Sequence, residues 1–176
     1  LTNMYDSLMG TDELSKADRS LLRAQIAFLG YRLDSPYVWD LERGFAGDPN
    51  NMHLSFNCSL GLVACVIHDH PMAGRWAEKA RWWIDKRLDQ YVGDNGVWII
   101  ENMHYAEVSL SVVLPFAIAA QRVGFCDFLA NKKLREWVRY IVKQLTPPNP
   151  QHGGFRTQPP DTVQDRDTRN AIAGVV

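Results

Sequence analysis

Two short segments of the chain place acid–base side chains at the entrance to strongly apolar stretches. The first is Asn50-Asn51-Met52-His53, and the second runs from Asp94 to Tyr105. An imidazole and a phenol beside an amide form a workable general acid–base set, because all three donate hydrogen bonds and two can transfer a proton. The candidate site residues in these two segments are Asn50, Asn51, His53, Glu101, His104 and Tyr105.

Helices must position these residues, because helical periodicity dominates the chain. Ser15 and Asp18 resemble a capping box, which predicts a helix that begins there and ends before Ser35-Pro36. Residues 37–50 contain glycine, aspartate and proline and are typical of a loop. Apolar spacing predicts four further helices, over residues 51–67, from 71 onward, over 102–123 and over 127–145.

The predicted helices alternate between two kinds. Those over 51–67 and 102–123 are apolar nearly all round, whereas their neighbours keep a charged face that we expect to include Lys86 and Arg87. Inner helices of a double layer are covered on every side and outer helices expose one face. The pattern therefore predicts an all-α fold of stacked antiparallel helical hairpins in one domain over 1–176, although a plain bundle fits the periodicity equally well.

The second segment also resembles a known family. Asp94, Gly96, Glu101 and Tyr105 follow the pattern Asp-x-Gly-x-x-x-x-Glu-x-x-x-Tyr, which is similar to that of heparinase II/III-like and alginate lyase-like polysaccharide lyases. In that group an Asn and a His stand near the start of an inner helix, and a Tyr follows some fifty residues later. His53 and Tyr105 are separated by 105 − 53 = 52 positions. The resemblance covers roughly residues 40–176 and implies an incomplete (α/α) toroid.

This resemblance implies β-elimination on uronate-containing glycans. Asn51 or Asn50, together with His53, would neutralise the uronate carboxylate, and Tyr105 would act as acid. In anti elimination His53 would be the base, whereas in syn elimination Tyr105 would perform both steps. Met52 stands between the asparagines and His53, where the family often has Asn directly before His, so the choice between the two asparagines stays open.

A long loop after the last full helix is expected to line the same site. The stretch 146–169 contains five prolines and two adjacent glycines, and structureless loops of this length are often functional. Its arginines are candidates for binding further uronates and for lowering the pKa of the tyrosine. We expect Arg156, Arg166 and Arg169 of this loop to bind the substrate together with Glu101 and His104.

Composition narrows the classes of function. The 176 residues are 46% hydrophobic and 22% charged with a net charge of −1, which gives no electrostatic case for binding nucleic acid or an anionic membrane. Ser109, Ser111 and Pro115 interrupt the longest apolar run, so no membrane span is expected. We expect no metal or cofactor, and the pair His68 and His70 shows no third ligand.

The ends of the chain suggest a fragment. It begins with Leu1, shows no signal peptide, and stops within an apolar stretch that ends at Val176. We therefore expect part of a larger toroid with a partial site and little activity, whose apolar edge is covered by the rest of the parent chain or by another copy. The resemblance implies a periplasmic or secreted protein.

Two rival functions remain open at the level of sequence. A glycoside hydrolase on a similar (α/α) barrel would require two carboxylates spanning the bond, and Glu101 could pair with Asp40, Asp48 or Asp94. A non-catalytic helical scaffold that binds carbohydrate would instead use the tryptophan-rich faces.

Overall fold

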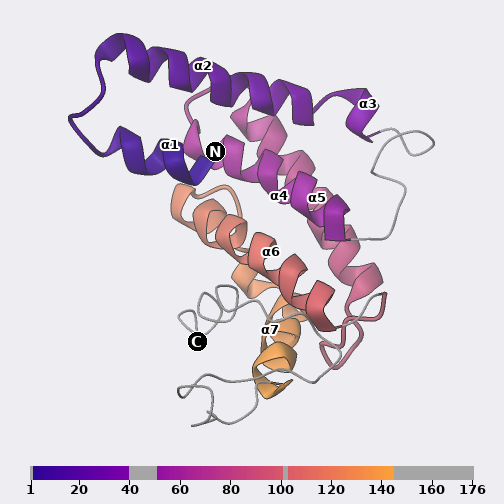
Figure 1. Ribbon diagram of the computed structural model, residues 1–176. Coiled ribbons are helices and arrows are strands. Elements are labelled where there is room, and N and C mark those ends of the chain that lie inside the picture. The colour runs from indigo at the N-terminus through magenta and orange to yellow at the C-terminus, as the bar shows by residue number, and fades with distance from the viewer. Residues whose placement is uncertain (1, 40–50, 101–102, 145–176) are drawn as a thin grey trace, which may run out of the picture.

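The computed structural model describes residues 2–39, 51–100 and 103–144. This part of the chain is all-α, and its β structure is a single isolated bridge between Val92 and Trp98. Figure 1 shows the elements in order. They are α1 (Thr2–Met9), α2 (Lys16–Leu33), α3 (Pro36–Trp39), α4 (Asn51–Val66), α5 (Ala73–Tyr91), α6 (Met103–Val123), the 3₁₀ turn η1 (Phe128–Ala130) and α7 (Lys132–Gln144).

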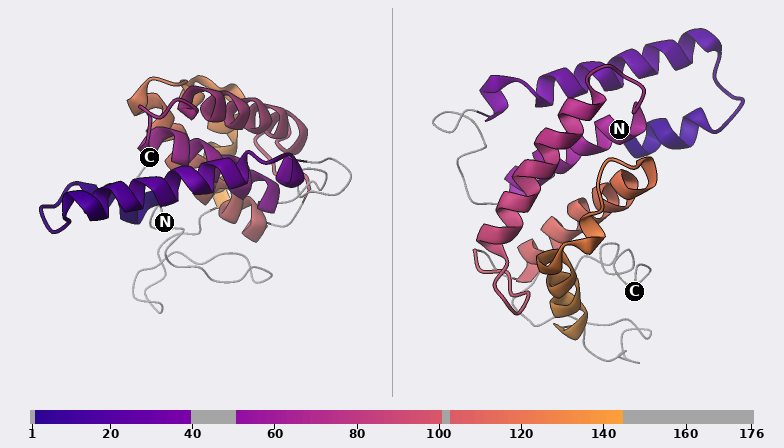
Figure 2. Two further views of the ribbon diagram at one scale, coloured as in Figure 1. Left: turned by 90° about the horizontal axis from the view of Figure 1, so that it is seen from above. Right: turned by 180° about the vertical axis from the view of Figure 1, so that it is seen from behind.

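Helix α4 lies at the centre of the arrangement. It packs against α5, α6, α2 and α1, and the α1–α2 pair runs antiparallel along one side of it (Figures 1 and 2). Helix α5 returns antiparallel to α4 after a short turn. Helix α6 runs in the same direction as α4 (Figure 1), and the C-terminal turns of the two helices line one cavity. The first turns of α4 and α6 therefore lie at the same end of the molecule.

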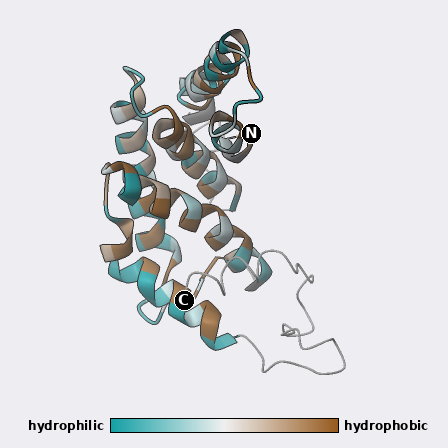
Figure 3. Ribbon diagram, turned by 90° about the vertical axis from the view of Figure 1, so that its left-hand side faces the viewer, coloured by the Kyte–Doolittle hydropathy of each residue, from teal (hydrophilic) through white to brown (hydrophobic). Residues whose placement is uncertain are grey.

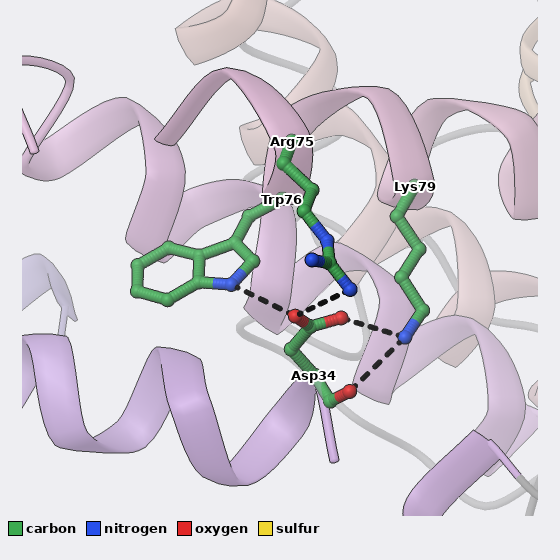
Figure 4. A network of polar contacts seen from close by, with 4 residues as sticks. All are labelled: Asp34, Arg75, Trp76 and Lys79. Carbon is green, nitrogen blue, oxygen red and sulfur yellow. Dashed lines mark hydrogen bonds and ion pairs between the residues drawn. The ribbon is translucent and has the colours of Figure 1, made fainter. Parts of the chain in front are cut away.

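The start and end of α2 are fixed by specific side chains. Ser15 Oγ accepts a hydrogen bond from the Asp18 amide at 3.2 Å, and the Ser15 amide donates to Asp18 Oδ2 at 3.2 Å. These two contacts confirm the predicted capping box. Asp34 caps the other end and anchors α2 to α5. Its carboxylate receives Lys79 Nζ at 2.7 Å and Trp76 Nε1 at 3.3 Å, with Arg75 at 3.8 Å (Figure 4).

The hydrophobic core consists of two clusters of buried residues. One lies between α1, α2, α4 and the start of α5 and includes Ile26, Leu60 and Trp76. The other lies between α4, α5, α6, η1 and α7 and includes Leu110 and Trp137. Helices α4 and α5 contribute residues to both clusters. Figure 3 shows the matching hydropathy pattern, with α7, the lowest helix in that view, largely hydrophilic with hydrophobic patches.

Several boundaries differ from those predicted. Helix α1 was not anticipated from the sequence, and the helix expected over 127–145 is divided into η1 and α7. The division has a local cause, because Asn131 Oδ1 accepts hydrogen bonds from the amides of Lys133 at 2.9 Å and Leu134 at 3.3 Å. An asparagine in that role is a helix cap and starts a new helix.

Helix α6 is more apolar than the interrupted run of residues suggested. The stretch His104–Val123 is long and apolar enough to cross a membrane, and half of that window is buried inside the described fold. A core helix of a folded domain has the same properties. Pro115 lies inside α6 with its side chain exposed, and it cannot donate the usual helical hydrogen bond to the carbonyl four residues earlier.

Candidate active site

The N-terminal turns of α4 and α6 and the C-terminal turns of α5 meet at one end of the molecule (Figure 1). His53 lies in the first turn of α4, and Tyr105 lies in the first turn of α6. Arg87 comes to the same end from the last turns of α5. The two sequence segments that carry acid–base residues are therefore brought to one end, because both helices are entered from that side.

His53 is buried, with 2% of its surface exposed. Its Nδ1 accepts a hydrogen bond from Arg87 Nε at 3.2 Å and lies 3.0 Å from Asn57 Nδ2. The edge of its ring packs against Trp83, with 5.0 Å between the ring centroids. The imidazole is thus held by side chains from both α4 and α5.

The surroundings of His53 disfavour its charged form. Burial lowers the pKa of the imidazole, and the positive charges of Arg87 and Lys86 lower it further, to about 4. His53 is therefore neutral at physiological pH. In that state it can donate or accept a hydrogen bond, but it carries no positive charge to attract a carboxylate.

Arg87 is the main residue that the sequence analysis misplaced. We expected it on the solvent face of α5, but only 7% of its surface is exposed. Its Nη1 donates to Gln90 Oε1 at 2.7 Å, and its guanidinium lies 5.3 Å from the Trp83 ring and 5.2 Å from the Tyr91 ring. A signal was present, since position 87 continues the buried stripe of Ala80, Trp83, Ile84 and Tyr91. A cation on such a stripe needs buried partners.

Asn57 is a second site residue that the sequence reading missed. It is fully buried one turn after His53, and its Nδ2 donates to the His53 backbone carbonyl at 2.6 Å. Its Oδ1 has no hydrogen-bond partner among the described residues. An amide one helical turn after a histidine on an apolar helix was the available signal, because a buried polar group at that spacing contacts the histidine.

Tyr105 is the accessible acid–base residue at this end. It is 40% exposed, and its ring lies 5.2 Å from that of His104, which is half-buried. Asn51 is also half-buried, and its backbone carbonyl accepts a hydrogen bond from Ser55 Oγ at 3.1 Å. A substrate from solvent would therefore meet Tyr105 before it met His53.

The glycine of the lyase-like pattern has a structural role. Gly96 has φ +79° in the turn between α5 and α6, and a Cβ there would collide with the backbone of Glu136 on α7. Asp94 is exposed, and Lys133 Nζ lies 3.4 Å from its carboxylate and 2.7 Å from the Val92 carbonyl. These two positions of the pattern therefore fix the turn against α7.

Several candidates lie outside the described residues. They include the alternative asparagine, the glutamate of the pattern, two of the possible hydrolase carboxylates and the whole loop 146–169. The residues concerned are Asn50, Glu101, Asp40, Asp48, Arg156, Arg166 and Arg169.

Residues Asp69 and His70 of the His68–His70 segment contact side chains of the protein. Asp69 forms an ion pair with Arg23 at 2.8 Å, and His70 stacks on Trp76 with 5.1 Å between ring centroids. The described part of the chain contains no group of three or more side chains that could hold a metal ion. Burial also raises the pKa of the Cys58 thiol, so this cysteine is a poor nucleophile.

A cavity of about 690 Å³ opens at the opposite end of α4 and α6. Its lining is mostly apolar and comes from α1, α4 and α6, with Arg122, His68 and Asp6 among the polar residues. None of the acid–base candidates lines it. The cavity is therefore separate from the candidate active site.

Comparison of this chain with family models, with curated proteins and with solved structures finds no match.

Proposed function

We propose that this chain is part of a polysaccharide lyase that cleaves uronate-containing glycans by β-elimination, with its helices forming part of an (α/α) toroid. The observation that supports this most is the common direction of α4 and α6. It brings the first turns that carry His53 and Tyr105 to one end, although 52 positions separate the two residues. A periplasmic or secreted location, where such polymers occur, forms part of the proposal.

The reaction needs a base, an acid and donors for a developing negative charge. The base removes the C5 proton of the uronate, the electron pair forms the C4–C5 double bond, and the C4–O4 bond breaks. The departing oxygen takes a proton, so the products are an unsaturated uronate and a free hydroxyl. Because the carbanion next to the carboxylate is an enolate-like dianion, neutral donors such as the Asn51 amide would stabilise it.

The geometry favours Tyr105 over His53 as the group that transfers protons. Tyr105 is exposed, whereas His53 is buried and its Nδ1 already accepts from Arg87. A tyrosine acting as both base and acid corresponds to syn elimination. In this assignment His53 contributes as a neutral donor and not as the base.

The test is an elimination assay on the full-length protein that contains this chain. Alginate, heparan sulfate and hyaluronan are the probes, and the new C4–C5 double bond is followed by its absorbance. Tyr105→Phe should lower kcat by about 10²–10⁴-fold, the usual contribution of general acid–base catalysis. Tyr37→Phe is the matched control, because Tyr37 is also an exposed tyrosine but lies on α3.

Each alternative outcome has a distinct meaning. Release of reducing ends without the double-bond absorbance would indicate a glycoside hydrolase. Binding without any cleavage would indicate a carbohydrate-binding scaffold. Full activity in Tyr105→Phe, with unchanged helicity, would remove Tyr105 from the mechanism.

A further inference from the structure

The guanidinium of Arg87 approaches the imidazole of His53 with two of its nitrogens. Nε donates to Nδ1 at 3.2 Å, and Nη2 lies 3.4 Å from Nε2. The remaining nitrogen, Nη1, donates to Gln90 Oε1, three positions along the same helix. The rings of Trp83 and Tyr91 lie beside the guanidinium at 5.3 and 5.2 Å. Arg87 is therefore fixed on several sides and directed at the histidine.

This contact determines where the imidazole carries its proton. An arginine side chain stays protonated and offers only donors. Two donors face Nδ1, since Arg87 Nε donates to it at 3.2 Å and Asn57 Nδ2 lies 3.0 Å from it, whereas Arg87 Nη2 approaches Nε2 at the longer distance of 3.4 Å. The surroundings therefore favour Nδ1 as the unprotonated acceptor. The proton of the neutral ring is then on Nε2. Whether one ring nitrogen of a histidine carries the proton is commonly determined by the hydrogen bond that the other ring nitrogen makes.

We propose that Arg87 is a positioning residue of the candidate lyase site, which holds His53 in the Nε2–H tautomer as a hydrogen-bond donor. The proposal rests on the proposed function for its catalytic part. In that part, the fixed donor contributes to stabilising the dianionic intermediate, and the proton transfers are left to Tyr105. Loss of the fixed tautomer would let Nε2 become an acceptor, which repels an oxyanion.

The charges around His53 come from two helices. Helix α5 contributes Arg87 and Lys86, and both act against a positive charge on the imidazole. Helix α6, which also packs on α4, carries the buried Glu107 and the half-buried His104 in its first two turns. Of these charged groups, Arg87 donates to Nδ1, and the neutral amide of Asn57 lies 3.0 Å from the same atom, so Arg87 acts together with Asn57 in favouring the Nε2–H tautomer.

The tautomer can be measured without any substrate. Long-range ¹H–¹⁵N NMR spectra of the histidine rings, recorded against pH, report which ring nitrogen carries the proton. In the wild-type protein, His53 Nδ1 should show the shift of an unprotonated nitrogen from neutral pH down to about pH 5. Arg87→Met should allow both tautomers and raise the pKa of His53 towards its ordinary value.

Two further variants separate the hydrogen bond from charge and from folding. Lys86→Met removes the neighbouring charge from the same turn and should leave the tautomer fixed. Arg87→Lys keeps a cation that can donate to Nδ1 and should restore the fixed tautomer if Arg87→Met loses it. Circular dichroism checks that each variant retains its helices. A wild-type ring protonated on Nδ1, or a fixed tautomer in folded Arg87→Met, would overturn the proposal.

The activity assay tests the catalytic part separately. Arg87→Met should reduce kcat by about tenfold or more, because a fixed donor is lost, and should add an acidic limb to the pH profile of kcat. The control variant Lys86→Met should have a kcat near that of the wild type. A fixed tautomer in a protein that eliminates no uronate overturns the proposed function and the catalytic part with it. An active enzyme whose kcat and pH profile are unchanged by Arg87→Met overturns the role of Arg87 alone.

Discussion

At the scale of single residues, the buried His53 should make the stability of the protein depend on pH. Burial, Arg87 and Lys86 lower the pKa of His53 to about 4, whereas an imidazole in the unfolded chain titrates near 6.5. Between these values the unfolded chain binds a proton that the folded chain does not. The free energy of unfolding should therefore fall as the pH drops from about 6.5 to about 4, by on the order of 2 kcal/mol from this residue.

Urea denaturation at a series of pH values measures this contribution. His53→Gln keeps a polar side chain but cannot titrate, so its free energy of unfolding should vary less over the same range. The quantity to compare is the slope against pH, because the substitution also changes stability at every pH. If the free energy of unfolding varied with pH in the same way in the wild-type protein and in His53→Gln, the pKa of His53 would be the same in the folded and unfolded chains.

The site could be predicted from sequence only where residue type and position agreed. The sequence predicted His53 and Tyr105 at the starts of two apolar helices, and they lie in the first turns of α4 and α6. Arg87 was missed because its charge argued for solvent, although its position on α5 belongs to the buried stripe. Asn57 was missed although its signal was local, since it lies one turn after His53 on the same helix and contacts that residue.

At the scale of secondary structure, the turn between α5 and α6 should depend strongly on Gly96. An alanine there would carry φ +79°, which L residues rarely adopt, and its Cβ would collide with the Glu136 carbonyl. We expect Gly96→Ala to lower the free energy of unfolding by about 2–4 kcal/mol, since both strain and overpacking contribute. Chemical denaturation followed by circular dichroism measures the loss.

Gly124 supplies a matched control for that substitution. It has a similar φ of +83°, but a Cβ at this position meets no atom within 4 Å. Gly124→Ala should therefore show the backbone strain alone, about 1–2 kcal/mol. Equal losses in the two variants would mean that the packing of the turn against α7 contributes nothing.

The helices themselves were predicted better than their ends. Apolar spacing located α2, α4, α5 and α6, because each buries a continuous stripe. The division between η1 and α7 was missed, since it depends on one side chain, Asn131, which bonds two amides. Periodicity averages over several turns and does not register a single cap.

At the scale of the whole molecule, α4 and α5 contribute residues to both hydrophobic clusters, so we expect the two clusters to unfold together. Leu54 and Cys58 of α4 belong to the cluster with α6 and α7, and Leu60 and Val63 belong to the cluster with α1 and α2. All four residues lie on one helix within less than three turns. Unfolding either cluster would expose one face of α4, so neither cluster should unfold without the other.

Core substitutions test this coupling. Leu110 is fully buried in the cluster with α7, and Leu110→Ala should cost about 2–5 kcal/mol by removing apolar burial and leaving a cavity. Native-state hydrogen exchange should show equal losses of protection in α7 and around Ile26 of α2, which belongs to the other cluster. Leu60→Ala is the reciprocal variant and should lower protection in α7 as much as in α2. If Leu110→Ala left the amides around Ile26 fully protected, the α1–α2 region would be an independent unit, and α4 would not transmit stability between the clusters.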